Sequence, residues 1–161
     1  MSPAKPELKR RIEFTQVAPE GIKALKGLAA YVHHHSGLEP RMLQLVWLRA
    51  SQMNGCAYCI DMHTKDARAA GETEQRIYGL SAWEETPFYT DRERAALAWT
   101  ETITAIYDNH VPDEAYEAAR RQFNEKELVD LTLAVIEINS WNRLAITFRS
   151  VPGSYQVQAK K

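Results

Sequence analysis

The chain has 161 residues, of which 45% are apolar and 25% charged, a composition typical of one ordinary soluble domain with its own apolar core. Twenty basic and 21 acidic residues give a net charge of -1, too balanced for the positive field that attracts nucleic acid or anionic membranes. No apolar run approaches the roughly 18 residues of a membrane span, and the N-terminus lacks the apolar core of a signal peptide. We therefore expect a cytoplasmic protein, whose thiols stay reduced.

Apolar residues recur every three or four positions through most of the chain, a spacing that predicts amphipathic helices. Ala95, Trp99 and Ile103 form one such stripe, and strict alternation of apolar and polar residues is sustained nowhere. We predict a single all-α domain over residues 1–161, a compact arrangement of six to seven helices. The expected helices lie near 19–33, 41–53, 55–70, 73–82, 91–108, 112–122 and 125–149.

Helix boundaries are marked by residues that favour caps and first turns. A proline in the first turn loses no hydrogen bond, and a capping residue three positions before a glutamate forms a capping box. The helix starts predicted in this way fall at Pro19, Pro40 and Pro112 and at the pairs Thr90–Glu93 and Asn124–Glu127. Residues 1–15 and 154–161 are expected to be solvated tails that carry Lys5, Lys9, Arg10, Arg11, Lys160 and Lys161.

Residues 51–63, SQMNGCAYCIDMH, contain the pattern C-x-x-C-x-x-x-H. On a helix that advances about 100° per residue, Cys56, Cys59 and His63 fall within an arc of about 60°. Asn54 is the expected N-cap of this helix, and Gly55 allows a tight turn before it. One helical face is therefore predicted to present two thiols and an imidazole.

Such a face suits thiol chemistry, because the thiolate is the nucleophile and both a helix N-terminus and a nearby imidazole favour it. The helix dipole favours the thiolate of Cys56. His63 lies one turn beyond Cys59 and is better placed to take the proton of that residue. The spacing alone leaves open which sulfur reacts.

Two other interpretations of the cysteine pair are inert buried thiols and a zinc site in which His63 is a third ligand. The candidates for a fourth zinc ligand are His33, His34, His35 and His110. Zinc is disfavoured because the chain has no second C-x-x-C, and a domain of this size needs no metal to fold. Core or subunit contacts are expected for the tryptophans, Trp47, Trp83, Trp99 and Trp141.

The run ASQMNGCAYCIDMHTKDARAAGE resembles the core of the alkylhydroperoxidase D-like proteins, within the carboxymuconolactone decarboxylase superfamily. The stretches ETPFYTDRERAALAWTE and INSWNRLAITFRSVPGSY are similar to the same family, so the likeness extends from about Leu38 to Tyr155. It implies an all-helical fold, a homo-oligomer (dimer, trimer or hexamer) and thiol peroxidase or disulfide reductase chemistry without a cofactor or metal. By this likeness Cys59 is the peroxidatic cysteine, Cys56 the resolving one and His63 the proton relay.

The implied cycle begins when the Cys59 thiolate attacks a hydroperoxide and becomes a sulfenic acid, which condenses with Cys56 to form a disulfide. An external dithiol, such as a thioredoxin-like or lipoyl protein, then reduces the disulfide. The alternatives are a zinc- or thiol-binding module without turnover, and a lyase like the muconolactone decarboxylases of the same superfamily.

One position departs from the family pattern. Members with well-defined peroxidase sites carry a glutamate twelve residues before the first motif cysteine, where this chain has Gln44, and an amide cannot accept a proton as a carboxylate can. Tyr58 stands where some relatives have histidine. Glu137, on a largely apolar helix, is a candidate substitute carboxylate, and Glu101 is a weaker one. We therefore expect slow peroxide turnover and stronger thiol–disulfide exchange.

Overall fold

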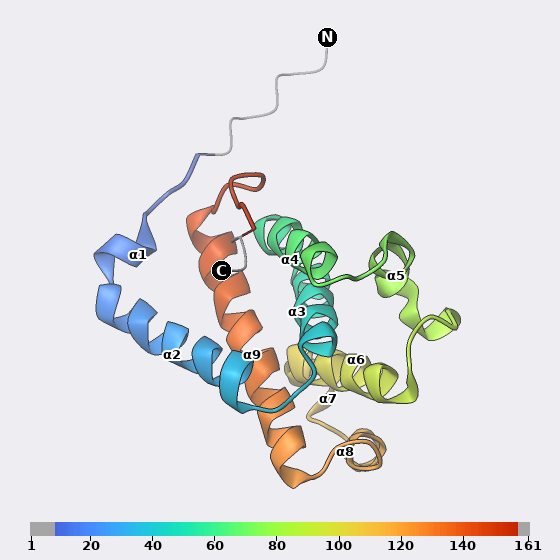
Figure 1. Ribbon diagram of the computed structural model, residues 1–161. Helices are drawn as coiled ribbons and strands as arrows, with labels where there is room; N and C mark the ends of the chain where they lie inside the picture. Colours follow the sequence, from blue (N-terminus) through green and yellow to red (C-terminus); the bar gives the residue numbers. More distant parts are fainter. Residues whose placement is uncertain (1–8, 158–161) are drawn as a thin grey trace.

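The structure is a computed structural model that describes residues 9–157, and all regular secondary structure in these residues is helical (Figure 1). The predicted all-α fold is confirmed, with nine α-helices and one 3₁₀ helix, η1, in the described part of the chain. The elements are α1 (Phe14–Val17), α2 (Pro19–His35), α3 (Pro40–Asn54), α4 (Ala57–Ala69), α5 (Glu74–Gly79), η1 (Leu80–Glu85), α6 (Asp91–Thr104), α7 (Ile106–Asn109), α8 (Asp113–Arg120) and α9 (Glu125–Phe148). None of these helices is long and apolar enough to cross a membrane.

The helices outnumber the predicted ones for local reasons. The helix predicted near 73–82 is α5 followed by η1, which contains a non-helical residue at Ala82. The helix predicted near 91–108 is interrupted at Ala105, so that it forms α6 and α7. Helix α1 has four residues, too few for a periodic pattern to show.

Both predicted capping boxes form. The side chains of Thr90 and Asn124 accept hydrogen bonds from the backbone N–H groups of Glu93 and Glu127, which fixes the starts of α6 and α9. The prediction for Asn54 is wrong: it is the last residue of α3 and does not cap the following helix. Its side-chain amide instead donates hydrogen bonds to two asparagines of α9, and these contacts join the end of α3 to α9.

Helix α9 is the central helix of the fold and packs against α2, α3, α4, α6 and α8 (Figure 1). Leu131, Val135 and Ile138 of α9 are buried in the main core together with Val46 of α3. A second apolar cluster, which includes Leu48, lies between α3, η1 and α6. Apolar packing on both sides therefore fixes α3, and α3, α4 and α9 carry the candidate site.

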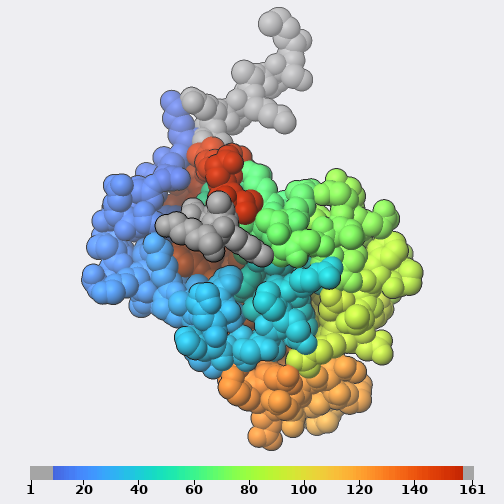
Figure 2. All heavy atoms as spheres, in the orientation of Figure 1, coloured from blue at the N-terminus to red at the C-terminus, as the bar shows by residue number. Residues whose placement is uncertain are grey.

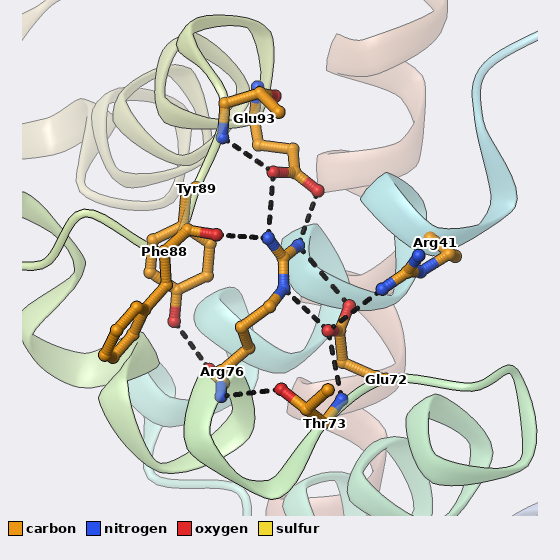
Figure 3. Close-up of polar contacts among 8 residues, drawn as sticks. Arg41, Glu72, Thr73, Arg76, Phe88, Tyr89 and Glu93 are labelled. Atoms are coloured by element: carbon orange, nitrogen blue, oxygen red, sulfur yellow. Dashed lines mark hydrogen bonds and ion pairs between the residues drawn. The ribbon is translucent and has the colours of Figure 1, made fainter.

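A largely buried arginine fixes α5 to the start of α6, as Figure 3 shows. Nε of Arg76 donates to Oε1 of Glu72 at 2.6 Å, and Nη2 donates to Oε1 of Glu93 at 2.6 Å. The hydroxyl of Tyr89 donates to the backbone oxygen of Arg76 at 2.5 Å, and Nη1 of Arg76 donates to the backbone oxygen of Phe88. We call these five residues the Arg76 clamp.

Lys9, Arg10 and Arg11 of the predicted N-terminal tail are exposed, as expected, but both terminal segments also contact the helices. The backbone N–H of Arg11 donates to the oxygen of Phe148 at 2.9 Å, and Arg10 forms an ion pair with Glu13. At the other end, the hydroxyl of Tyr155 donates to a carboxylate of α4. Both segments therefore pack on the helices. The tail residues Lys5, Lys160 and Lys161 lie outside the described residues.

Candidate active site

The two cysteines lie at the start of α4, where the backbone positions them. Gly55 has a φ of 67°, in the left-handed region that glycine adopts without strain. This turn makes Cys56 the N-cap of α4, and its sulfur accepts a hydrogen bond from the N–H of Cys59 at 3.4 Å. The two sulfurs are joined in a disulfide. The structure thus brings the predicted pair together, although Cys56 precedes the helix rather than lying within it.

Both cysteines are buried, with 1% of each residue exposed, and a cavity of about 620 Å³ reaches one of them. Cys59 lines this cavity together with His63. Cys56 forms no part of the wall that the described residues build, and it packs in a small cluster with Ala145 of α9. A molecule in the cavity can therefore contact Cys59 but not Cys56.

The cavity lies between α2, α3, α4 and α9, and the terminal segments complete its wall. In Figure 2, α9 is recessed between the blue N-terminal helices and the green residues of α4. The buried wall residues include Trp47, His63 and Glu137, whereas exposed polar side chains, among them Lys26 and His33, lie at the mouth. A cavity of this size, with aromatic walls and a few buried polar groups, is typical of a small-molecule site.

His63 contacts Gln44 of α3, and this contact selects a tautomer. Nδ1 of His63 lies 3.3 Å from Oε1 of Gln44. Because an amide oxygen can only accept, the contact favours a hydrogen on Nδ1 and leaves Nε2 as the basic nitrogen. Burial, and to a smaller extent the charge of His33, lowers the pKa of His63 to about 3. The imidazole is therefore neutral at physiological pH.

The indole of Trp47 lies against this imidazole. The ring centroids of Trp47 and His63 are 5.6 Å apart in a stacked arrangement, and the ring of His33 lies 4.5 Å from that of Trp47. Nε1 of Trp47 and Nε2 of His63 are both buried, and neither has a hydrogen-bond partner among the described residues. Two nitrogen atoms at the buried end of the cavity are thus left for a bound molecule to satisfy.

Glu137, the candidate substitute carboxylate, is buried and does not lie at an exposed edge of α9. Only 5% of the residue is exposed, and Nε1 of Trp141 donates to its Oε1 at 2.7 Å. Burial raises the pKa of Glu137 to about 7, against the opposing effects of the hydrogen bond from Trp141 and of the N–H of Trp47, which lies near the carboxyl without forming a hydrogen bond of normal geometry. Close to pH 7 the carboxyl is therefore present in both its protonated and its ionised form.

A second polar group lies nearer the mouth of the cavity. The hydroxyl of Tyr155 donates to Oδ1 of Asp66 at 2.7 Å, and both residues line the wall. Burial raises the pKa of Asp66, against the opposing effects of this hydrogen bond and of the charge of His33. The C-terminal segment therefore contributes a side chain to the candidate site.

The model of the carboxymuconolactone decarboxylase family matches residues 19–102, which are more than half of the chain and include Gln44, Cys56, Cys59 and His63. The chain belongs to the carboxymuconolactone decarboxylase family. It is also similar to the uncharacterised protein YdfG of Bacillus subtilis (strain 168), at 48% identity over 139 residues, which are 86% of this chain and 94% of YdfG.

Solved structures show the same fold. The structure of a protein of unknown function from Agrobacterium tumefaciens, for which a role as an antioxidant defence protein AhpD has been suggested, has a TM-score of 0.87 and 45% identity over 91% of this chain and 100% of its own. An uncharacterised peroxidase-related protein with an AhpD core, from Ralstonia eutropha JMP134, has a TM-score of 0.76 and 18% identity over 87% and 74% of the two chains. The predicted alkylhydroperoxidase D-like fold is confirmed, and members of this family are generally enzymes.

Within this carboxymuconolactone decarboxylase fold, the sequence interpretation missed several wall residues. Trp47 and Trp141 pack in or against the main core, as expected, but they also line the cavity, and neither Asp66 nor Tyr155 was singled out. One signal was readable in advance: Trp141 follows Glu137 by four residues, which places the indole and the carboxyl side by side on one helix.

The sequence also pointed to Tyr58 and Glu101, and only Tyr58 lies at the cavity. Tyr58, the residue that stands where some relatives have histidine, lines the cavity. Glu101 does not, because its carboxyl accepts hydrogen bonds at 2.7 Å from Nε of Arg49 and Nε1 of Trp83 in another part of the molecule. No group of three or more histidine, cysteine, aspartate or glutamate residues within 9–157 is placed to hold a metal ion.

Proposed function

We propose that this protein is a thiol-dependent oxidoreductase that reduces hydroperoxides, or protein disulfides, by cycling Cys56 and Cys59 between dithiol and disulfide. One observation carries the proposal: Cys59, bonded to Cys56, lines a cavity of about 620 Å³ one helical turn from a neutral imidazole. The family membership, and the antioxidant or peroxidase-related descriptions of proteins with the same fold, support it.

The oxidising half of the cycle uses three side chains. In the reduced protein, Nε2 of His63 takes the proton of the Cys59 thiol, directly or through one water molecule. The thiolate attacks the distal oxygen of R–O–O–H, so that an S–O bond forms as the O–O bond breaks, and a sulfenic acid and an alkoxide result. The alkoxide takes up one proton and becomes an alcohol. The thiol of Cys56 then condenses with the sulfenic acid, which releases water and forms the disulfide.

The reducing half needs an external dithiol, for which we propose a lipoyl or thioredoxin-like protein. Because both sulfurs are buried and only Cys59 lines the cavity, the attacking thiol must enter the cavity. An extended lipoyl arm fits this requirement better than a dithiol on the surface of a folded protein. Attack on Cys59 releases Cys56 as a thiolate at the N-terminus of α4, where the helix dipole stabilises negative charge.

A decarboxylase-like lyase is the second candidate, because the family match itself favours it. In such an enzyme, His63 and Glu137 would serve as base and acid at the buried end of the cavity. That chemistry has no use for two sulfurs, so it should survive replacement of both cysteines by serine. The third possibility, a thiol-binding module without turnover, predicts that the reduced cysteines resist oxidation.

The proposal is tested by adding cumene hydroperoxide to the fully reduced protein without reductant and counting the remaining thiols. Loss of two thiols per chain, with consumption of one hydroperoxide, is expected, and the double variant Cys56→Ser/Cys59→Ser should consume none. Metal analysis of the same sample reports any bound zinc. Thiols that persist while the hydroperoxide is unchanged would contradict the proposal, and stoichiometric zinc with protected thiols would favour a binding module.

A further inference from the structure

The buried end of the cavity contains an acidic group that the cycle above does not use. The carboxyl of Glu137 comes from α9, on a different wall from Cys59 and His63, which both belong to α4. The hydrogen bond from Trp141 fixes the orientation of this carboxyl. The unpartnered Nε1 of Trp47, which is itself only 1% exposed, lies in the same part of the wall.

Cleavage of a hydroperoxide requires a proton on the side of the molecule away from the sulfur. The attacking sulfur, the distal oxygen and the departing oxygen lie roughly in line, so the departing oxygen points into the cavity. His63 lies one turn from Cys59 on the same helix, and it is placed to serve the sulfur. An alkoxide is a poor leaving group without a proton donor, and Glu137, which lines the same cavity from another helix, is a carboxyl that can supply this proton.

We propose that the Glu137 carboxyl donates a proton to the departing oxygen of the hydroperoxide, directly or through one water molecule, while Nε1 of Trp47 donates a hydrogen bond to that oxygen. The inference rests on the proposed function. In balanced form, the Cys59 thiolate, R–O–O–H and the carboxyl of Glu137 give the Cys59 sulfenic acid, R–OH and the Glu137 carboxylate. The imidazolium of His63, which holds the proton of the Cys59 thiol, returns a proton to Glu137 through the cavity.

The surroundings of Glu137 keep its proton available. Burial, rather than a neighbouring charge, is the main cause of its raised pKa of about 7. The charged or titratable groups that face it across the cavity belong to the N-terminal segment, α2, α4 and the C-terminal segment, and they include Arg10, Glu13, Lys26, His33, His63 and Asp66. None of these groups is among the causes of its pKa shift.

The test compares two oxidants that differ in the basicity of the departing group. Cumene hydroperoxide releases an alkoxide, which needs a proton, whereas peracetic acid releases acetate, which does not. In Glu137→Gln, single-turnover oxidation of the reduced protein by cumene hydroperoxide should slow about 10²-fold, the usual contribution of a general acid. Oxidation by peracetic acid should change less than about threefold, since it bypasses that acid. Trp47→Phe should show the same selectivity with a smaller loss.

Two controls keep structural effects separate. Asp130→Asn removes another buried carboxyl of α9, one that accepts a hydrogen bond from Tyr31 and lies outside the cavity, so it should leave the ratio of the two rates unchanged. Reduction of the disulfide by dithiothreitol should proceed normally in Glu137→Gln, because it involves no departing alkoxide.

The possible results separate this inference from the proposed function. Equal losses with both oxidants, or no loss with either, would overturn the role of Glu137 and leave the thiol cycle in place. A wild-type protein that keeps its thiols with both oxidants would overturn the thiol cycle, and the role of Glu137 would fall with it.

Discussion

Nδ1 of His63 and Oε1 of Gln44 are 3.3 Å apart, and this contact orients the imidazole beside Cys59 without placing a negative charge next to it. An amide oxygen accepts a hydrogen bond from the neutral ring but carries no charge that would stabilise the imidazolium. Burial then lowers the pKa of His63 without compensation. The protein therefore has a well-oriented but weak base, which agrees with the slow peroxide turnover expected from the sequence.

Gln44→Glu should accelerate hydroperoxide reduction by about tenfold, because a carboxylate at this position would raise the pKa of His63 by about one unit or more. Steady-state turnover of cumene hydroperoxide at saturating reductant measures the effect. Gln52→Glu is the matched control, since Gln52 lies on the same helix but outside the cavity, where it contacts Arg49. Unchanged or lower turnover in Gln44→Glu would show that this position does not tune the base.

The two cysteines should behave differently on replacement because only Cys59 reaches the cavity. Cys59→Ser should abolish hydroperoxide consumption. Cys56→Ser should still react once and leave a sulfenic acid on Cys59, which a cyclic dione would label and mass spectrometry would locate. Activity retained in Cys59→Ser, with the oxidised sulfur on Cys56, would reverse the two roles.

Features encoded by neighbouring residues were predictable from the sequence, and those encoded by distant contacts were not. The starts of α6 and α9 depend on capping residues within one turn, so they could be placed in advance. The start of α4 could not, because Asn54 binds residues about 85 positions away on α9 and so ends the preceding helix. A short sequence pattern cannot predict a contact with a residue so far away in the chain.

In the candidate site, too, contacts between neighbouring residues were predictable and contacts between distant ones were not. Cys56, Cys59 and His63 lie within eight consecutive residues, so helix geometry brings Cys59 and His63 together and the turn before the helix adds Cys56. The packing of Trp47 on His63 joins two helices, and the contribution of Tyr155 depends on how the C-terminal segment folds back. Neither has a sequence signature, which is why both were missed.

Loss of the Arg76 clamp should destabilise the fold without changing the chemistry of the cavity (Figure 3). In Arg76→Met, the carboxyl of Glu72, whose side chain is 2% exposed, loses its closest cationic partner, and the free energy of unfolding should fall by about 3 kcal/mol. Arg68→Met removes an ion pair with Glu74 in which both side chains are more than 40% exposed, and it should lower the free energy of unfolding much less. Urea unfolding measures both. Equal effects would mean that burial does not distinguish the two arginines.

The pKa of Glu137 predicts how stability depends on pH. The pKa rises from an ordinary value of 4.5 to about 7 in the folded protein, so between these values the folded state holds a proton that the unfolded state has lost. The contribution of Glu137 to stability is therefore complete below pH 4.5 and decreases as the pH rises towards 7, by about 3 kcal/mol at most.

Glu137→Gln cannot lose this proton and should gain stability relative to the wild type between pH 5 and pH 8. The lowered pKa of His63 makes the stability rise with pH, but this effect is present in both proteins and cancels in the comparison. Urea unfolding of both oxidised proteins at pH 5 and at pH 8 measures this gain in the free energy of unfolding. A difference between the two proteins that is the same at both pH values would show that Glu137 is already ionised at pH 5.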